Sequence, residues 1–317
     1  MLRNAHVLIT GASGFVGRRL SIALMATVGK VTQLVHTMSS MVNKPDTQII
    51  LDLTDRKRVA ETFTKLQPNY VIHLAGIKDR NNIGAQQFRY LYETNIAISL
   101  NVIEACLELH NLKKLIYLGS CDEYGQGAAP FDEMQREMPV NSYGLSKLAV
   151  TNMLLALYHS HHLPSVVLRP TVIYGPNQGS EMFLSGMIQS LLINKDFLMT
   201  LGDQFRDFVY VDDVVGAIIK VLFAGDQMNG KVVNIGAGVS CQIKKIAMLV
   251  ANLIHPNAYS YIRFGAVQYR QNEVMDYAVN IMLAKQLLGW YPNTPLEKGL
   301  QQTINHFRDH DCSALTT

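Results

Sequence analysis

The chain has 317 residues, 48% of them hydrophobic, and a formal net charge of +3. A chain of this length can bury a sizeable core, which predicts one large or two modest domains. Because the charge is nearly neutral for this size and Lys and Arg form no block, neither nucleic acid nor an anionic membrane surface is the expected partner.

The composition also bears on where the protein works. No apolar stretch approaches the roughly 20 residues of a membrane span. The six residues up to His6 are too few for a signal peptide, so we expect a soluble, cytoplasmic protein. The cysteines have neither disulfide-framework nor metal-ligand spacing, which predicts free thiols and no metal site. They are Cys106, Cys121, Cys241 and Cys312.

Short β-rich apolar runs alternate with helical segments over the first two-thirds of the chain. The runs are residues 6–10, 31–35, 48–51, 70–74, 114–118 and 165–168. Runs that are apolar on both faces and separated by helices form a parallel sheet covered on both sides, so we predict an α/β fold with a doubly wound parallel sheet. Ligands of such folds bind at the carboxyl edge of the strands.

A glycine-rich loop, Thr10-Gly-Ala-Ser-Gly-Phe-Val-Gly17, follows the first run and leads into a helical segment at 18–26. Gly11, Gly14 and Gly17 permit a tight turn, close approach of a pyrophosphate and close packing of helix on strand. The helix N-terminus adds free N–H donors. A glycine triad alone is a weak signal, but its place between first strand and first helix predicts a dinucleotide site.

The end of the second run indicates which nicotinamide cofactor binds. An acidic residue there would bind the ribose 2′-hydroxyl of NAD, and a basic one would accommodate the 2′-phosphate of NADP. The chain reads Leu34-Val-His36-Thr-Met-Ser-Ser40, without a carboxylate. His36 with Ser39 or Ser40 is suited to a phosphate, which favours NADP over NAD, although His36 alone also fits an ordinary surface imidazole.

After Pro170 the pattern loosens, with two more apolar runs at 208–211 and 231–235. This region predicts a smaller mixed α/β substrate-binding lobe, interleaved with strands that return to the sheet. We expect residues 1–170 plus 207–236 to form the dinucleotide-binding domain, and residues 171–206 plus 237–317 to form the substrate-binding lobe.

Three polar residues are expected at the carboxyl edge near the cofactor. Ser120 follows the fifth run, and Tyr143 and Lys147 lie four residues apart on one face of a predicted helix. Alone, each fits a turn or the start of an amphipathic helix. Together they suit hydride transfer: a tyrosine with a reference pKa near 10 needs about 4 kcal/mol of help to exchange protons near neutrality. An ammonium about 4 Å away supplies roughly that much.

Further motifs follow in a characteristic order: Asp52-Leu53, His73-Leu-Ala-Gly76, Asn95, Leu168-Arg-Pro-Thr-Val-Ile-Tyr-Gly-Pro176, Arg206-Asp-Phe-Val-Tyr-Val-Asp-Asp213, Asn234-Ile-Gly236 and Leu288-Gly-Trp290. With them the chain resembles the extended short-chain dehydrogenase/reductases of the nucleotide-sugar epimerase/dehydratase type. The resemblance covers about residues 5–300. It implies a Rossmann fold and a cofactor-dependent enzyme acting on a nucleotide sugar.

The resemblance also implies roles for residues. Tyr143 is the acid or base, Lys147 assists it and holds the nicotinamide ribose, and Ser120 orients the sugar oxygen. The implied substrate-binding residues are Asp122, Asn177, Arg206 and Arg270. The implied cofactor-binding residues are Gly11, Ser13, Gly14, Phe15, Val16, Gly17, His36, Asp52, Leu53, Leu74, Ala75, Gly76, Asn95, Tyr143, Lys147 and Pro170.

The chain departs from the family pattern at a few positions. The family more often has Ala at Gly76 and an acidic residue at Asn280. Sugar 4,6-dehydratases that resemble this chain carry a carboxylate two residues after the Ser or Thr, matched here by Asp122, and some carry an Asp directly after it, where Cys121 stands. Dehydration needs that extra acid and base, so it is not favoured.

Three functions remain open at this point. The missing NAD-selecting carboxylate favours a reductase of a nucleotide-linked 4-keto-6-deoxy sugar. An epimerase or dehydratase with retained NAD is the alternative, and a non-catalytic NADP-sensing protein is a third, which would not need Ser120, Tyr143 and Lys147.

Two further features concern surfaces. The histidines at 159–162 are interpreted as a helix end rather than a metal site. Helices around 88–110 and 148–160 carry more apolar surface than one sheet contact needs, and such helices pair in relatives, so we expect a homodimer.

Overall fold

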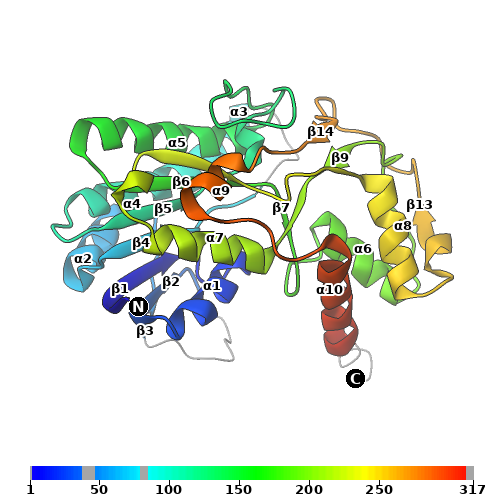
Figure 1. The fold of residues 1–317 in the computed structure, drawn as a ribbon, viewed down its shortest axis with the longest axis horizontal. Coiled ribbons are helices and arrows are strands. Elements are labelled where there is room, and N and C mark those ends of the chain that lie inside the picture. Colours follow the sequence, from blue (N-terminus) through cyan, green and yellow to red (C-terminus); the bar gives the residue numbers. More distant parts are fainter. Residues whose placement is uncertain (1, 38–46, 79–84, 312–317) are drawn as a thin grey trace.

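The computed structural model describes residues 2–37, 47–78 and 85–311 of the chain. Its centre is a seven-stranded sheet in the order β11-β6-β5-β4-β1-β2-β3, with all neighbours parallel (Figure 1). The strand order reverses direction at β1, the position where doubly wound sheets bind ligands. The predicted doubly wound parallel sheet is confirmed. Its strands are β1 (Leu2–Thr10), β2 (Val28–Val35), β3 (Thr47–Ile50), β4 (Tyr70–His73), β5 (Lys114–Leu118), β6 (Ser165–Pro170) and β11 (Lys231–Ile235).

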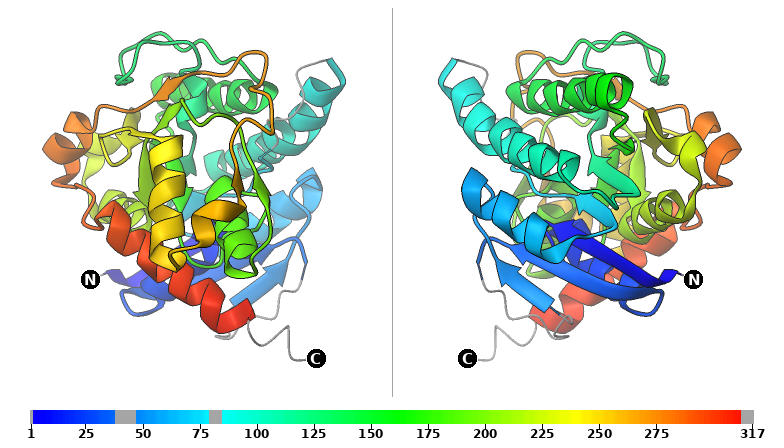
Figure 2. Two further views of the ribbon diagram at one scale, coloured as in Figure 1. Left: turned by 90° about the vertical axis from the view of Figure 1, so that its right-hand side faces the viewer. Right: turned by 90° about the vertical axis from the view of Figure 1, so that its left-hand side faces the viewer.

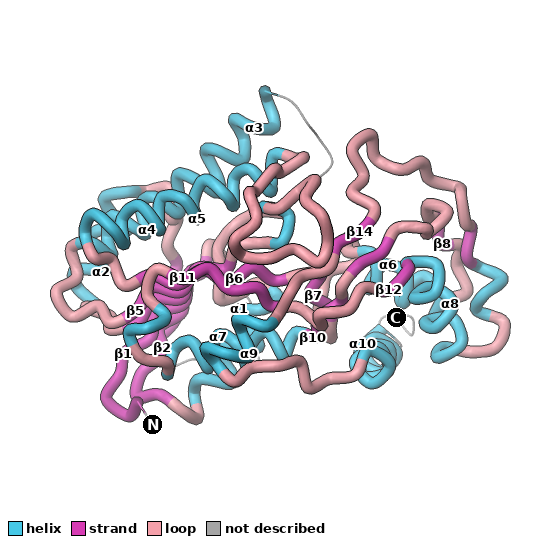
Figure 3. The backbone as a smooth tube through the Cα atoms, turned by 45° about the horizontal axis from the view of Figure 1, so that its top comes forward, coloured by secondary structure: helices cyan, strands magenta, loops and turns pink. Residues whose placement is uncertain are grey.

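Helices cover both faces of this sheet (Figure 3). In β1, Leu8 packs into the core on one face, and Val7 and Ile9 pack into the core on the other, because successive side chains of a strand point to opposite faces. The first face is covered by α2 (Arg56–Leu66), α4 (Ala97–Leu107) and α5 (Ser142–His161), and the second by α1 (Phe15–Met25), α7 (Val211–Phe223) and α9 (Met282–Leu288).

The chain changes its pairing partner where β6 ends. Thr171 donates its N–H to Ile235 in β11, whereas the next residue donates to the carbonyl oxygen of Asp207. The continuation, β7 (Val172–Tyr174), therefore pairs with β10 (Phe208–Tyr210) outside the large sheet. The expectation that both late runs return to the sheet is correct only for β11, because β7 takes β10 as its own partner.

A second hydrophobic core forms around α6 (Phe183–Leu192), α8 (Ile243–Ile254) and α10 (Leu296–Asp311), seen at the right of Figure 1. We retain the two-domain boundaries predicted from the sequence as a proposal. The smaller elements are β8 (Phe197–Leu198), β9 (Phe205–Arg206), β12 (Cys241–Gln242), β13 (Ile262–Arg263), β14 (Asp276–Tyr277) and the helical turns η2 (Cys121–Glu123), η3 (Asp226–Met228) and η4 (Ala258–Tyr261).

Helix α5 has a capping residue at each end. The side chain of Asn141 accepts the N–H of Gly144 at 2.7 Å. At the other end His162 adopts a left-handed conformation with φ 55°, after His159 and His161 in the last turn. The interpretation of residues 159–162 as a helix end is confirmed. Across residues 2–37, 47–78 and 85–311, no helix has the length and apolar character needed to cross a bilayer.

Candidate active site

The glycine loop lies between β1 and α1, and its backbone leaves room for a dinucleotide. Gly11 has φ +66°, and a Cβ there would lie 2.7 Å from the backbone nitrogen of Ala75. A Cβ on Gly17 would collide with the carbonyl oxygen of Gly11. Helix α1 begins at Phe15 after Gly14, and no side chain caps it, so its first N–H groups can bind phosphate. The loop therefore fits the pyrophosphate of a nicotinamide dinucleotide.

The end of β4 is tied to β1 beside this loop. The Thr10 hydroxyl lies 2.7 Å from Nδ1 of His73 and accepts the N–H of Ala75 at 3.3 Å. On its other side the His73 ring contacts the Ser99 hydroxyl at 2.9 Å. Burial, and then the charge of Lys147, lower the pKa of His73 to about 3. A neutral imidazole thus holds the strand end that is expected to meet the cofactor.

Asn95 lies in η1 (Tyr92–Ile96), a π-helical turn between α3 (Ala85–Leu91) and α4. Its Oδ1 accepts the N–H of Ile77 at 2.7 Å. Its Nδ2 donates to the Ile77 carbonyl oxygen at 2.9 Å and to the Ser146 hydroxyl at 3.2 Å. The predicted cofactor residue therefore joins the loop after β4 to helix α5. Such π-helical turns occur frequently at functional sites.

The carboxyl end of β2 leads to the exposed His36. Asp52, after β3, is the nearby carboxylate. Its pKa is lowered by hydrogen bonds from the backbone N–H and the hydroxyl of Thr54, and further by His36. The Asp52 carboxylate, predicted to bind the cofactor, is thus already bonded to Thr54. The predicted phosphate ligands Ser39 and Ser40 lie outside the described residues.

Ser120, Tyr143 and Lys147 come together at the carboxyl edge of β5, and all three side chains are buried. The first turn of α5 lies against the Ser120 loop so closely that a Cβ on Gly144 would collide with the carbonyl oxygen of Asp122. The Nζ of Lys147 lies 5.9 Å from the centre of the Tyr143 ring. The fold thus assembles the three residues predicted for catalysis.

Lys147 is held at the end of β5. Its Nζ donates to the carbonyl oxygen of Leu118 at 2.9 Å and lies 4.8 Å from the centre of the Tyr117 ring. Burial lowers the pKa of Lys147 to about 8, and the negative charge of Glu123 opposes that shift. The ammonium is therefore the main form at neutral pH and is lost under mildly alkaline conditions.

The hydroxyl of Ser120 is oriented by Asp122. It donates to Oδ2 of Asp122 at 3.0 Å and accepts the backbone N–H of the same residue at 3.1 Å. Asp122 is only 2% exposed, yet it lines a pocket beside this loop. Asp122 therefore contacts both the buried Ser120 hydroxyl and the pocket that could hold a substrate.

Two adjoining pockets extend from this loop toward the second core. The inner pocket is lined by Cys121, Asp122 and Asn141, and the outer one, of about 390 Å³, by Phe183 and Gln268 among others. Both include Val172, Arg206, Arg270 and Glu273.

The predicted substrate arginines, Arg206 and Arg270, thus lie together between the two pockets. Arg206 forms an ion pair with Glu273 and lies 5.1 Å from the Tyr277 ring. The exposed Asn177, with φ +68°, is not among the residues that line either pocket.

The other predicted cofactor residues lie at the sheet edge: Ser13 and Val16 in the glycine loop and first helical turn, Leu53 after β3, Leu74 and Gly76 after β4, and Pro170 at the end of β6. Sequence reasoning missed Thr10, His73 and Glu123 as supports of the site. For Glu123 a signal was present, because Ser120 and Glu123 have the Ser-x-x-Glu spacing of a capping box.

The fold and these residues define a nicotinamide-dependent enzyme of the short-chain dehydrogenase/reductase class. The family model for the NAD dependent epimerase/dehydratase family matches residues 7–236. The chain belongs to that family, and the resemblance inferred from its motifs is confirmed.

Several known proteins are similar over nearly the whole chain. The dTDP-D-glucose 4,6-dehydratase of Bos taurus is 26% identical, over 96% of this chain and 89% of its own. CDP-abequose synthase of Salmonella muenchen is 25% identical, over 95% and 98%. The solved structure of UDP-glucose 4-epimerase from Thermotoga maritima with UDP-glucose is 26% identical, with a TM-score of 0.86 over 96% and 99%.

Proposed function

We propose that the protein reduces a nucleotide-linked 4-keto-6-deoxy sugar with NADPH. The observation that carries this proposal is the meeting of Ser120, Tyr143 and Lys147 in one buried site, next to a loop that fits a dinucleotide. By their names, the relatives act on or form dTDP-, CDP- and UDP-linked sugars, which supports a nucleotide sugar as the substrate.

The residues of the chain have distinct tasks in such a reduction. A bound NADPH supplies the hydride that the carbonyl carbon of the sugar receives. Tyr143 donates its phenolic proton to the carbonyl oxygen. The hydroxyl of Ser120, which bonds Asp122 in the present structure, has to turn toward this oxygen to donate a hydrogen bond that holds it in line. The Lys147 ammonium, 5.9 Å from the ring centre, stabilises the negative charge left on Tyr143.

The nucleotide part of the substrate would lie in the outer pocket. Arg206 and Arg270 line both pockets, and guanidinium groups suit the oxygens of a diphosphate. Arg206 is paired with Glu273, so the diphosphate has to replace or share that partner. In this proposal the sugar would extend from the outer pocket toward Asp122 and the catalytic residues, past the smaller inner pocket that Asp122 lines.

The choice of NADPH rests on the end of β2. The acidic residue that would bind the ribose 2′-hydroxyl is missing there, and the exposed His36 is available to a 2′-phosphate. Asp52 lies after β3 rather than at the end of β2, and its Oδ1 already accepts two hydrogen bonds from Thr54. Net reduction also consumes a reduced cofactor, which NADPH supplies.

An epimerase with retained NAD is the second candidate. The similarity to UDP-glucose 4-epimerase, with a TM-score of 0.86, favours it. Dehydration is supported by Asp122, which contacts the Ser120 hydroxyl, but Cys121 stands where some dehydratases have a further carboxylate. A non-catalytic NADP-sensing protein is the third candidate, and it would have no need of the buried trio.

One set of assays separates the enzymatic candidates. Purified protein is incubated with a nucleotide 4-keto-6-deoxyhexose and NADPH, and the loss of NADPH absorbance is compared with product formed. A reductase consumes one NADPH for each sugar. Turnover of a non-keto nucleotide sugar without added cofactor would indicate an epimerase or a dehydratase instead. Formation of a keto-sugar with loss of water would identify a dehydratase.

We also propose a homodimer formed through α3, η1, α4 and α5, which lie side by side on one outer face (Figure 2, right). Apolar side chains there are 36% to 53% exposed: Phe88, Tyr92, Leu100, Leu107 and Leu145. Sedimentation should give twice the mass of 35.4 kDa. Leu100→Glu should give monomers, whereas Ile193→Glu, at an exposed position after α6, should leave the dimer intact.

A further inference from the structure

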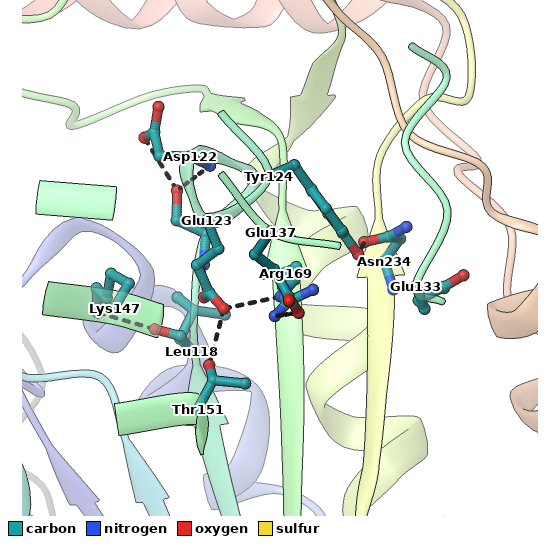
Figure 4. A network of polar contacts seen from close by, with 11 residues as sticks. Leu118, Asp122, Glu123, Tyr124, Glu133, Glu137, Lys147, Thr151, Arg169 and Asn234 are labelled. Atoms are coloured by element: carbon teal, nitrogen blue, oxygen red, sulfur yellow. Dashed lines mark hydrogen bonds and ion pairs between the residues drawn. The ribbon is translucent and has the colours of Figure 1, made fainter. Parts of the chain in front are cut away.

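Glu123 is a carboxylate with no exposed surface directly behind the catalytic loop. Its Oε1 accepts the backbone N–H of Ser120 at 2.9 Å. Its Oε2 accepts the hydroxyl of Thr151 at 2.9 Å and Nε of Arg169 at 2.8 Å. Figure 4 shows the carboxylate between the helix that carries Lys147 and the strand that carries Arg169. Glu123 therefore connects three elements: η2, α5 and β6.

Two of these contacts reach the catalytic residues at short range. Ser120 receives its backbone anchor from Glu123 while its hydroxyl faces Asp122. Thr151 lies one helical turn after Lys147 on α5. The hydrogen bond from Thr151 to Glu123 therefore fixes the distance between this part of α5 and the loop that carries Ser120. The Glu123 carboxylate thus holds both the backbone of Ser120 and the helix that carries Lys147.

The charge of Glu123 is balanced by Arg169. The Arg169 side chain is also fully buried, and its guanidinium lies 4.6 Å from the centre of the Tyr124 ring. Its Nη2 donates a hydrogen bond to Oε1 of Glu137 at 2.8 Å. Burial raises the pKa of Glu123, and the Arg169 charge opposes that shift. Since guanidinium stays protonated, the pair favours the carboxylate form.

We propose that Glu123 is a positioning residue for catalysis, which holds Ser120 and the helix of Lys147 at their working distance and keeps a negative charge behind the lysine. The proposal rests on the proposed catalytic roles of Ser120, Tyr143 and Lys147. The titratable groups around the ammonium are Glu123 from η2, Tyr117 from β5, His73 from β4 and Tyr143 from α5 itself. Glu123 supplies the carboxylate among them.

The test compares Glu123→Gln, Thr151→Val and Glu137→Gln. Glutamine keeps the volume but places an amide N–H₂ against Ser120 N–H or against the donors of Thr151 and Arg169. We expect kcat to fall about 100-fold, as for a small misplacement of reacting groups, with KM for the nucleotide sugar unchanged. Thr151→Val removes one contact and keeps the charge, so its kcat should fall less. Glu137→Gln changes only the outer partner of Arg169 and should retain the original kcat.

A second readout does not need a sugar. Binding of NADPH, followed by its fluorescence, should weaken as the pH rises through about 8 in the unmodified protein, where Lys147 loses its charge. In Glu123→Gln this weakening should start at a lower pH, whereas Thr151→Val should keep the original midpoint. If no sugar is turned over, the proposed function fails while this measurement still tests Glu123.

The inference is overturned if folded Glu123→Gln keeps its kcat and its pH midpoint. It is also overturned if Glu137→Gln loses as much activity as Glu123→Gln, because the role would then be general stability. Should Glu123→Gln not fold, Thr151→Val decides: original kcat in that variant contradicts the proposal.

Discussion

The ammonium of Lys147 lies 5.9 Å from the centre of the Tyr143 ring, on the side of the helix that faces the end of β5. Both residues belong to α5, so their relative positions follow from one turn of regular helix. Burial makes the interaction between them stronger than it would be in water. Their neighbour Ser120 comes from a different element and needs the packing of α5 against η2.

Replacing Tyr143 by Phe removes the proton donor and should lower kcat by several orders of magnitude. NADPH binding should persist, because the ring still packs in its buried position. Steady-state kinetics and fluorescence titration measure the two effects. Tyr291→Phe, at a position 57% exposed, is the control and should retain full activity. A Tyr143→Phe protein with undiminished activity would contradict the enzymatic proposal.

Replacing His36 by Asp should reverse the cofactor preference. The unmodified protein is expected to bind NADPH more tightly than NADH, and a carboxylate at this position would repel the 2′-phosphate while accepting the ribose 2′-hydroxyl. The ratio of the two dissociation constants is the measurement. His110→Asp, exposed after α4, introduces the same charge elsewhere and should leave the ratio unchanged. Tighter binding of NADH by the unmodified protein would refute the NADPH assignment.

Gly76→Ala should be tolerated and slightly stabilising. A Cβ at this position would lie 3.4 Å from Oδ1 of Asn95 and 3.5 Å from Nζ of Lys147, which is ordinary contact. The smaller backbone freedom of the unfolded chain should raise the free energy of unfolding by about 0.4 to 1 kcal/mol. Gly11→Ala is the matched opposite, since φ is +66° and Ala75 leaves no room.

Urea unfolding of both glycine variants checks these expectations. Gly11→Ala should be less stable than the original chain and should bind NADPH poorly. A destabilised Gly76→Ala would show that the strand end has less space than the structure indicates.

Acid should destabilise the fold through His73. Its folded pKa is about 3, below the value of about 6.5 in the unfolded chain. The unfolded state therefore takes up the proton first, and stability declines as the pH falls from about 6.5 toward 3. The full loss is as much as ~5 kcal/mol. His73→Gln should be less stable at pH 7 but should lose less on acidification.

Urea unfolding at pH 7 and 4.5 measures this difference. His161→Gln, exposed at the end of α5, should keep the original dependence on pH. Equal slopes for the original chain and His73→Gln would mean that other groups control acid unfolding.

The sheet could be predicted in most of its strands. The predicted runs 114–118 and 231–235 coincide with β5 and β11, because both are largely apolar and mostly buried. The run 6–10 starts late: β1 begins at Leu2, where pairing with Val28 extends a segment that lacks the apolar pattern. The pairing of β10 with β7 could not be predicted, since it depends on where the chain leaves β6.

The candidate site was predictable where a motif marks it. Ser120, Tyr143 and Lys147 follow from their places after a strand and on a helix. The burial that lowers the pKa of Lys147 arises from elements distant in sequence. Likewise, the pockets bring Asp122 near Arg206 and Arg270, which no local pattern indicates.

The π-helical turn at Tyr92–Ile96 makes the number of residues in this helical segment part of the architecture of the candidate site. A regular helix rotates by about 100° with each residue, so deleting Ile96 would swing the Asn95 amide away from both Ile77 and Ser146, its present partners. The chain would keep all of its functional side chains, but the hydrogen bonds by which Asn95 joins the loop after β4 to α5 would be lost. Evolution could thus retune this enzyme here by a single-codon insertion or deletion rather than by exchanging one amino acid for another.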